Sequence, residues 1–345
     1  MQGRGAHATK MREKTALIVT SISAPNPVLE SLARGSVQHD VEFIVIGDEK
    51  SPATFNLDGC RFYGLDEQRK LDFAFAKKCP TRHYARKNIG YLLALRNGAT
   101  AMIETDDDNF PEDAFWSDRQ RRQTVPFSTN AGHLNVYRYF SDVNIWPRGL
   151  PLDKINAPLP AFESLPKSEV DCPIQQGLAN ENPDVDAIYR LVLPLPQNFR
   201  RDRRIALGDG SWCPFNSQNT TWWRDAFPLL YLPAYCSFRM TDIWRSFVAQ
   251  RIAWANGWSI LFHEPTVWQA RNEHNLMRDF RDEVPGYLHN AAICDALAAL
   301  QIKPGVANLG ENLRACYAKL IEQEWVGDQE LELVDAWLHD LDAIR

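Results

Sequence analysis

Residues 99–111 read ATAMIETDDDNFP, a largely apolar run that passes directly into three consecutive aspartates. The first six residues, 99–104, have the composition of a buried strand. Asp106, Asp107 and Asp108 then follow its carboxyl end, which is where open α/β sheets bind their ligands. The stretch therefore predicts an α/β fold with an acidic ligand site at the end of a central strand.

Two similar apolar runs precede this strand. Residues 16–21 read ALIVTS and residues 41–46 read VEFIVI, and short β-branched runs of this kind are typical of buried parallel strands. Residues 27–35, which lie between them, predict a short helix. The resulting order of strand, helix and strand is that of a nucleotide-binding α/β half.

Polar residues end the first two of these strands. Thr20 and Ser21 follow the first apolar run, and Asp48 follows the second. A nucleobase and a ribose would dock at these strand ends in a nucleotide-binding half. Ordinary strand-end capping and turn chemistry explains each residue equally well.

A basic cluster precedes the third strand. Residues 81–97 predict a helix, on which Arg82 and Arg86 are neighbours at i and i+4, followed by Lys87. Guanidinium groups bind phosphate through two parallel hydrogen bonds, so this cluster could clamp a diphosphate. The alternative is a basic, solvated helix face.

The three aspartates have the chemistry of a divalent-cation site. Asp106 and Asp108 are separated by one residue, so their carboxylates point the same way in an extended turn. One can reach a hard cation such as Mn²⁺ or Mg²⁺ while the other reaches a ribose or a metal-bound water. Such an ion would neutralise a diphosphate leaving group. The alternative is a solvated acidic turn that caps a short helix at 111–115.

Further ionisable candidates lie in the last third of the chain. Residues 242–256 predict an apolar helix that starts at Asp242, which could be a general base, part of a metal site or a simple N-cap. His263 and His274 flank Trp268, and either imidazole could complete a metal shell. A purely structural role is the alternative for both histidines.

The remaining segments are less periodic. Residues 140–215 are rich in Pro and Gly and predict loops and short strands, residues 258–262 predict a strand, and the chain beyond residue 285 is mainly helical. The expected organisation is a flexible leader at 1–14, a nucleotide-sugar-binding half at 15–150, an acceptor half at 151–285 and a helical C-terminal extension at 286–345.

Composition and missing motifs exclude several classes of protein. A net charge of −6 argues against a nucleic-acid binder, and the seven scattered cysteines contain no C-x-x-C pair for zinc. P-loop, G-x-G-x-x-G and nucleophile signatures are absent. The first 14 residues are too polar for a signal peptide, and no apolar run is long enough to span a bilayer. We therefore expect a cytoplasmic protein, while the 11 Trp leave room for peripheral membrane contact and a homodimer.

Several longer blocks occur in order along the chain: 84–94 (YARKNIGYLLA), 104–108, 146–152 (WPRGLPL), 175–177, 182–186, 214–219 (PFNSQN), 241–251 and 336–340. Together they resemble the STELLO glycosyltransferase family over nearly the whole sequence. That family is in turn distantly similar to the reversibly glycosylated polypeptides, which act as UDP-arabinopyranose mutases.

The resemblance implies a glycosyltransferase A fold, in which a Rossmann-like nucleotide-binding half and an acceptor half share a mostly parallel mixed sheet. It implies Mn²⁺ or Mg²⁺ as cofactor. On the matching motifs, Asp106 and Asp108 become the nucleotide and metal aspartates, Arg86 and Lys87 the basic pair, and Asp242 a second acidic site.

Two further positions follow from the same resemblance. Asp184 and Asp186 match a Pro-Asp-x-Asp motif and are expected to be acceptor-side or structural residues. The mutases carry a metal-binding His directly after a Trp, whereas here Gln269 follows Trp268. His274 is the nearest replacement for this third ligand.

We therefore expect a metal-dependent glycosyltransferase that acts in surface polysaccharide biosynthesis. Its donor would be a nucleoside-diphosphate sugar, with a UDP-sugar as the leading candidate, and its acceptor a glycan or a lipid-linked molecule. Asp242 would deprotonate the acceptor while the metal and Arg86 hold the diphosphate. One alternative is a sugar-nucleotide mutase in which Arg148 carries the sugar transiently. The other is a non-catalytic scaffold of a glycan-synthesis complex.

Overall fold

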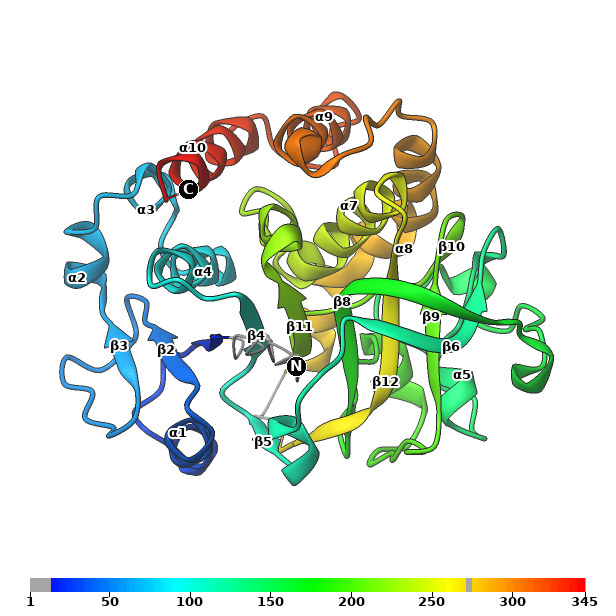
Figure 1. Cartoon of the computed structure of the whole chain (residues 1–345), viewed down its shortest axis with the longest axis horizontal. Helices are drawn as coiled ribbons and strands as arrows, with labels where there is room; N and C mark the ends of the chain where they lie inside the picture. Colours follow the sequence, from blue (N-terminus) through cyan, green and yellow to red (C-terminus); the bar gives the residue numbers. More distant parts are fainter. Residues whose placement is uncertain (1–13, 271–274, 345) are drawn as a thin grey trace, which may run out of the picture.

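The computed structural model describes residues 14–270 and 275–344, which fold around one ten-stranded mixed sheet (Figure 1). The strands, in order across the sheet, are β3 (Arg61–Tyr63), β2 (Glu42–Ile46), β1 (Thr15–Thr20), β4 (Ala101–Thr105), β11 (Asn219–Trp223), β8 (Lys167–Asn180), β6 (Arg122–Ser128), β9 (Arg204–Leu207), β12 (Trp258–Gln269) and β5 (Asn109–Pro111). A small second sheet pairs β10 (Ser211–Trp212) with β7 (Gly132–His133). The mixed α/β fold expected from the sequence is confirmed.

The first half of the sheet is entirely parallel. β1 pairs with β2 on one side and with β4 on the other, and β2 pairs with β3. The three apolar runs at 16–21, 41–46 and 99–104 form β1, β2 and β4, as expected. Their carboxyl ends therefore meet at one edge of the sheet, which brings the residues that follow each strand together.

Helices cover both faces of this parallel half. Successive strand residues point to opposite faces, so Leu17 packs with α1 (Pro27–His39) while Ile18 packs with α4 (Lys87–Arg96). Gly90 lets α4 approach closely, because a Cβ there would lie 2.6 Å from Ile18 Cγ2. The two helices thus fix the parallel half as a three-layer unit.

The helix expected at 81–97 begins later than predicted. A 3₁₀ turn, η1 (Tyr84–Arg86), leads into α4, and Arg82 has a φ of 56°, in the left-handed region. The backbone N–H of His83 donates to the Asp48 carboxylate, which holds this turn against the end of β2. Arg82 and Arg86 are therefore not neighbours on one helix face, which corrects that expectation.

The stretch expected to contain only loops and short strands holds the longest strand of the sheet, the 14-residue β8. It pairs with β11, β6 and β12, and the pairings of β8, β6, β9 and β12 close into a ring. A small apolar core lines this ring: Val125, Val170, Cys172, Ala206 and Leu261. Long-range pairing therefore orders a segment whose local sequence is not strand-like.

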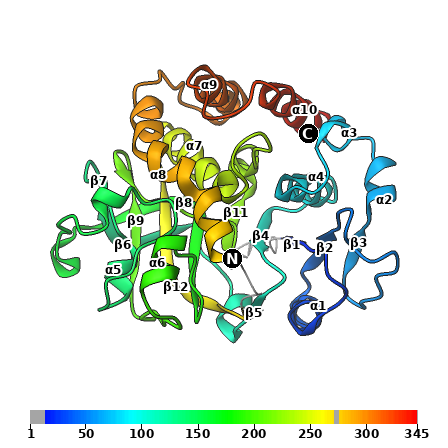
Figure 2. The same cartoon turned by 180° about the vertical axis from the view of Figure 1, so that it is seen from behind.

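The helical C-terminal region is confirmed. It contains α8 (Leu276–Ala298), α9 (Leu309–Glu322) and α10 (Glu330–Ile344). The helix expected at 242–256 is α7 (Thr241–Ala255), which precedes β12. Because α8 begins at Leu276, the expected boundary between residues 285 and 286 falls inside a helix. α9 and α10 run along one side of the molecule above α7 (Figures 1 and 2).

Side-chain carboxylates fasten α10 to the rest of the fold. Asp340 accepts hydrogen bonds from the backbone N–H groups of Ala74 and Phe75, each at 2.8 Å, and so caps α3 (Ala74–Lys78). Glu330 accepts from the Tyr231 hydroxyl and from the backbone N–H groups of Ala234 and Tyr235. Burial raises the pKa of Glu330 to about 7, although these donors act in the opposite direction.

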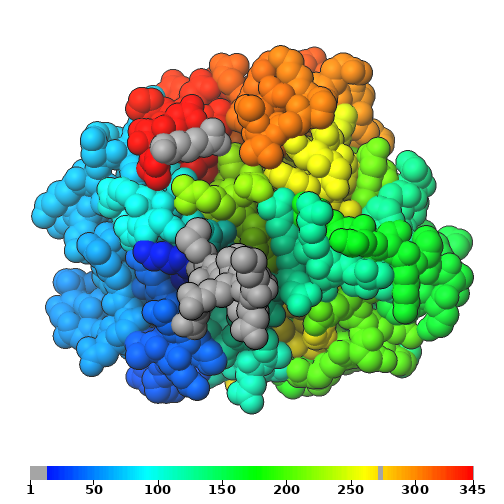
Figure 3. All heavy atoms as spheres, in the orientation of Figure 1, coloured from blue at the N-terminus to red at the C-terminus, as the bar shows by residue number. Residues whose placement is uncertain are grey.

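Short helices complete the fold: α2 (Leu65–Arg69), α5 (Tyr137–Phe140), α6 (Ala187–Val192), η2 (Asp113–Trp116), η3 (Leu152–Lys154), η4 (Phe162–Ser164), η5 (Arg224–Leu230), η6 (Phe238–Met240) and η7 (Val306–Asn308). In the space-filling view the N-terminal part of the chain, in blue and cyan, lies beside the green middle part (Figure 3). All seven cysteines are free thiols. Within 14–270 and 275–344, no helix combines the length and the apolarity needed to cross a membrane.

Candidate functional site

The three aspartates, which we call the acidic triplet, follow β4 directly. Asp106 and Asp107 are half-buried, and Asp108 is 9% exposed. β11 runs antiparallel to β4 and places Asn219 opposite Thr105, whose hydroxyl donates to the Gln218 carbonyl at 2.7 Å. The triplet thus lies where the parallel half of the sheet meets the second half.

A buried lysine holds the first aspartate. The Lys87 side chain is 0% exposed, and its Nζ donates to Asp106 Oδ1 at 3.2 Å and to the Thr105 carbonyl at 2.7 Å. The Tyr84 hydroxyl donates to the same carboxylate oxygen at 2.7 Å. Burial raises the pKa of Asp106, while Lys87 and Tyr84 partly offset this. Asp106 Oδ2 accepts no hydrogen bond from the described residues and can receive a ligand.

The second aspartate joins the triplet to the first strand. The Ser21 hydroxyl donates to Asp107 Oδ2 at 2.5 Å, and Asn26 Nδ2 donates to the Asp107 carbonyl at 2.9 Å. Burial raises the pKa of Asp107. Ser21 therefore lies beside the triplet, and Thr20 is the last residue of β1. Asp48 instead accepts from a backbone N–H at the start of η1.

The third aspartate contacts the strand at the far edge of the sheet. Gln269 Nε2 donates to both carboxylate oxygens of Asp108 at 3.1 Å each. The pairing of β12 with β5 sets this contact, because it aligns Gln269 with Asn109. The residue after Trp268 therefore occupies a position next to the triplet, although its type differs from the expected His.

The donor set around the triplet suits a hard divalent cation. It offers carboxylate oxygens of Asp106 and Asp108 and the amide oxygen of Gln269, and Mg²⁺ and Mn²⁺ prefer oxygen ligands. Among residues 14–270 and 275–344 no group of three His, Cys, Asp or Glu side chains is arranged to hold a metal. His274, the expected third ligand, lies outside the described residues.

His263 does not belong to this donor set. It is 6% exposed within β12, its Nδ1 contacts the Glu264 carbonyl at 2.9 Å, and burial lowers its pKa to about 4. A neutral imidazole in this position packs inside the sheet. The structural interpretation of His263 therefore fits the geometry.

Two of the three expected clamp residues point elsewhere. The buried Arg86 guanidinium donates to the Gln68 side chain and to the Cys79 carbonyl, so it ties η1 to the segment before it. Arg82 is exposed and pairs with Glu49 at 2.5 Å. Lys87 alone of the three contacts the triplet, which corrects the expected arginine clamp.

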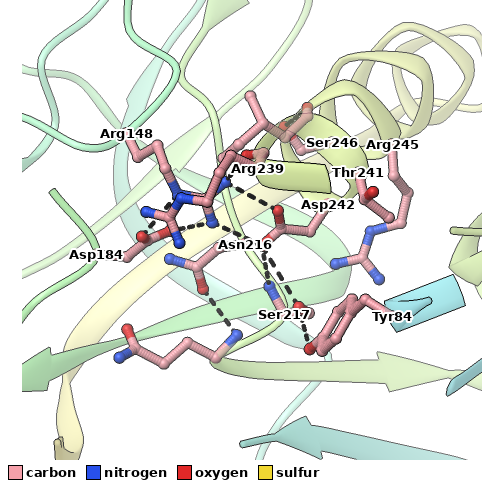
Figure 4. A network of polar contacts seen from close by, with 12 residues as sticks. Tyr84, Arg148, Asp184, Asn216, Ser217, Arg239, Thr241, Asp242, Arg245 and Ser246 are labelled. Carbon is pink, nitrogen blue, oxygen red and sulfur yellow. Dashed lines mark hydrogen bonds and ion pairs between the residues drawn. The ribbon is translucent and has the colours of Figure 1, made fainter. Parts of the chain in front are cut away.

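A chain of polar contacts leads from the triplet into the second half, and Figure 4 shows the part of it from Tyr84 to Arg148. The Tyr84 hydroxyl, which donates to Asp106, also lies 2.7 Å from Ser217 Oγ. The backbone N–H and hydroxyl of Ser217 donate to Asp242 Oδ2 at 3.2 and 3.4 Å. Asp242 in turn pairs with Arg148, so one network links Asp106 to Arg148.

Arg148 is the hub of this network. Its guanidinium donates to both oxygens of Asp184 at 2.8 Å, to Asp242 at 3.0 and 3.1 Å, and to the Arg239 carbonyl. These contacts use all five N–H donors of an arginine that is 6% exposed. Arg148 therefore has no donor left to carry a sugar, which disfavours its expected role in a mutase.

The environment of Asp242 does not favour a general base. Burial alone would raise its pKa, but the Arg148 guanidinium outweighs this effect and lowers the pKa to about 2. A carboxylate with so low a pKa accepts a proton poorly near neutral pH. The contacts of Asp242 are those of a positioning residue, which holds Arg148 and Ser217. Its role as a general base stays a prediction.

The Pro-Asp-x-Asp motif is structural in its contacts. Asp184 anchors Arg148, and Asp186 caps α6 through the Tyr189 backbone N–H at 2.8 Å while accepting from Trp146 Nε1 at 2.7 Å. Burial raises the pKa of Asp186 to about 6.

Sequence reasoning did not assign three residues of the site, namely Tyr84, Ser217 and Gln269. Tyr84 and Ser217 lie inside the recognised blocks 84–94 and 214–219, which offered a signal but no role. Only the register of β12 against β5 reveals the position of Gln269.

Comparison with known proteins shows which family the chain is similar to. Residues 239–345 match the model of the STELLO glycosyltransferases. Two Arabidopsis thaliana proteins are similar: probable glycosyltransferase STELLO2 is 28% identical over 322 residues, which cover 87% of this chain and 41% of that protein. Probable glycosyltransferase STELLO1 is 26% identical over 350 residues, which cover 95% of this chain and 44% of that protein. The chain spans less than half the length of these relatives.

Solved structures show only distant likeness. The M. tuberculosis glucosyl-3-phosphoglycerate synthase aligns with a TM-score of 0.40 at 10% identity, over 81% of each chain. S. aureus TarS in complex with UDP aligns with a TM-score of 0.35 at 13% identity, over 96% of this chain and 83% of that one.

Proposed function

We propose that this chain, which is similar to the STELLO glycosyltransferases, transfers a sugar from a nucleoside-diphosphate sugar to a glycan or lipid-linked acceptor. UDP-sugars are the proposed donors, Mn²⁺ or Mg²⁺ the proposed ion, and surface polysaccharide biosynthesis the proposed setting. One observation carries the proposal: the acidic triplet follows the central parallel strand, with Asp106 bound to Lys87 and Asp108 bound to Gln269.

The charges in the site suit a divalent ion. Three carboxylates lie together in a partly buried place, and the Lys87 ammonium pairs with the Asp106 carboxylate. Asp106, Asp108 and the Gln269 amide oxygen would hold the ion, and a bound ion neutralises the charge that develops on a departing diphosphate.

The chain's own residues fix the rest of the site. Lys87 and Tyr84 hold the Asp106 carboxylate in one orientation, and Ser21 holds Asp107 toward the end of β1. Preorganised groups of this kind lower a barrier because they need no rearrangement during the reaction. Ser217 contacts both Tyr84 and Asp242, so it connects the two halves of the chain at the site.

Nucleotide binding tests the proposal directly. We would measure the melting temperature of the full chain with UDP, GDP and several UDP-sugars, with and without Mn²⁺. A ligand at about 100 times its Kd stabilises the fold by about 2.7 kcal/mol, so we expect a rise of several degrees for UDP with Mn²⁺. UDP release in the presence of acceptor glycans then tests turnover.

A matched pair of variants locates the effect. Asp108→Asn should abolish the Mn²⁺-dependent part of the shift, whereas Asp113→Asn, at an exposed position in η2, should behave like the wild type. If no nucleotide raises the melting temperature of the wild type in Mn²⁺, the proposal is wrong and the scaffold alternative gains support.

A further inference from the structure

A second feature beside the triplet is an open pocket of about 520 Å³. Its wall includes Trp268 and Gln269 from β12, Glu181 and Asn182 from the segment after β8, and Asn198. Gln269 belongs to both places, because its side chain binds Asp108 while it also lines the pocket. A molecule in the pocket would therefore lie next to the acidic triplet.

Trp268 provides an aromatic platform in this pocket. It is 37% exposed, although tryptophan is usually well buried. Its ring stacks on Phe110 with centroids 4.4 Å apart and planes 13° apart, a contact set by the β12–β5 pairing. The stack fixes the orientation of the Trp268 ring, and the exposed part of this ring lines the pocket. A rigid indole presents a flat apolar surface at low entropic cost.

Polar groups surround the platform. Asn182 Nδ2 donates to the backbone carbonyl of Gln269 at 2.9 Å. This hydrogen bond fixes the Asn182 side-chain amide and leaves the Asn182 Oδ1 atom as an acceptor. Within the part of the chain that the structure describes, the Glu181 carboxylate and the Asn198 amide form no hydrogen bond or ion pair. These groups offer both donors and acceptors of the kind that bind hydroxyls.

The backbone at this wall is strained. Glu181 has a φ of 68°, which is unusual for a residue other than glycine. Two backbone hydrogen bonds with Gln197, at 2.9 and 3.0 Å, hold it in this conformation. This conformation places Glu181 on the pocket wall.

The charge of the pocket limits its ligand. Arg201 forms two short hydrogen bonds with the Glu112 carboxylate, so this pair compensates itself. Among the described residues that line the pocket, Glu181 then contributes the net charge, which is negative. An anionic ligand such as a phosphate or a uronic acid would be repelled, whereas a neutral ligand with many hydroxyl groups fits the aromatic platform and the amides.

We infer that this pocket is the acceptor subsite and binds a neutral sugar unit of a glycan, with its ring stacked on Trp268. The inference rests on the proposed function, since it names the acceptor class for that reaction. The volume is within the range of small-molecule sites and is large enough for a sugar ring. The hydrophobic C–H face of the sugar would lie on the indole and its hydroxyls would meet Asn182, Asn198 and Glu181.

A glycan array tests the inference. We would apply the full chain, with UDP and Mn²⁺ present, to an array of neutral, uronic-acid and sulfated oligosaccharides. We expect retention on neutral glycans, a loss of at least tenfold in Trp268→Ala and partial retention in Trp268→Phe. Asn198→Ala, an exposed change that should not affect folding, should weaken binding several-fold. Leu288→Ala, at an exposed apolar position in α8, is the control and should bind like the wild type.

The outcomes separate the two proposals. If wild-type protein binds no neutral glycan, or binds only anionic ones, or if Trp268→Ala and Asn198→Ala bind as well as the wild type, the acceptor subsite is refuted. The melting-temperature shift with UDP and Mn²⁺ is recorded for every variant. A normal shift together with failed glycan binding refutes the subsite alone, whereas a missing shift in the wild type refutes the proposed function.

Discussion

Gln269 at the end of β12 donates to both carboxylate oxygens of Asp108 at 3.1 Å each, and this contact joins the edge of the sheet to the acidic triplet. The amide at this position can present its oxygen instead of its nitrogen, because both lie on one planar group. Gln269 can therefore move from binding Asp108 to binding a cation held by Asp108.

The first prediction concerns this position. Gln269→His places an imidazole beside Asp108, and the neutral imidazole is the commonest metal ligand among protein side chains. We expect the affinity for Mn²⁺ in the presence of UDP to rise several-fold, measured by isothermal titration calorimetry. Gln269→Leu, which removes the amide oxygen, should lower the affinity instead. Equal affinities in the three proteins would show that Gln269 lies outside the cation site.

The second prediction concerns the buried lysine. Lys87→Met leaves Asp106, the Thr105 carbonyl and Tyr84 without their shared donor. Breaking a buried ion pair typically costs about 3–5 kcal/mol, and we expect a loss of this size in the free energy of unfolding in urea. Mn²⁺ should restore part of it in this variant, because a cation can replace the ammonium charge beside Asp106.

A matched control uses an exposed ion pair. Lys78 binds Glu332 at 3.1 Å with both side chains well exposed, so Lys78→Met should cost less than about 1 kcal/mol. If Lys87→Met and Lys78→Met lower the free energy of unfolding by the same amount, the burial of Lys87 does not strengthen its contribution to stability.

The sequence predicts the parallel half of the fold well because its strands carry their own signal. β1, β2 and β4 are apolar over consecutive residues, and this pattern arises from burial on both faces. β8 escapes prediction because its central residues include Gln175 and Gln176, which are buried only through pairing with other strands. Burial that depends on distant segments leaves no local pattern.

The same distinction between local patterns and long-range contacts applies to the site. The triplet follows from its place at a strand end, and of the three basic residues before β4 only Lys87 contacts it. The choice between Arg86 and Lys87 depends on where α4 begins, which the Asp48–His83 hydrogen bond determines. Arg148 lies 94 residues from Asp242 along the chain, so the ion pair between them cannot be seen in the sequence.

The third prediction distinguishes positioning from proton transfer at Asp242. A general base typically contributes a factor of about 100 to 10,000 in rate, whereas a positioning residue acts mainly through stability and fit. We expect Asp242→Asn to destabilise the fold and to reduce transfer by less than about 100-fold. Asp242→Ala should cost about 3–5 kcal/mol, because Arg148 then lacks one of its two carboxylates.

Urea unfolding and initial rates measure these two effects. Asp335→Asn is the matched control, since Asp335 pairs with Arg314 at a position where both side chains are about half exposed. A large loss of transfer in Asp242→Asn with unchanged stability would restore the general-base interpretation and overturn ours.

The fourth prediction concerns pH and the anchor of α10. Burial raises the pKa of Glu330 from 4.5 in the unfolded chain to about 7 in the fold. The folded state therefore binds the proton more tightly, so the stability from this group is full below pH 4.5 and is lost as the pH rises through about 7. A shift of this size corresponds to roughly 3 kcal/mol between the two limits.

Glu330→Gln separates this effect from the other titrations of the protein. The amide is neutral at every pH, so the difference in unfolding free energy between wild type and variant should decrease as the pH rises from 5 to 8. The variant should still be the less stable of the two at pH 5, because its NH₂ group faces the backbone N–H donors of Ala234 and Tyr235. A difference that stays constant over this range would show that Glu330 is already ionised in the fold at pH 5. The three hydrogen-bond donors around it would then outweigh its burial.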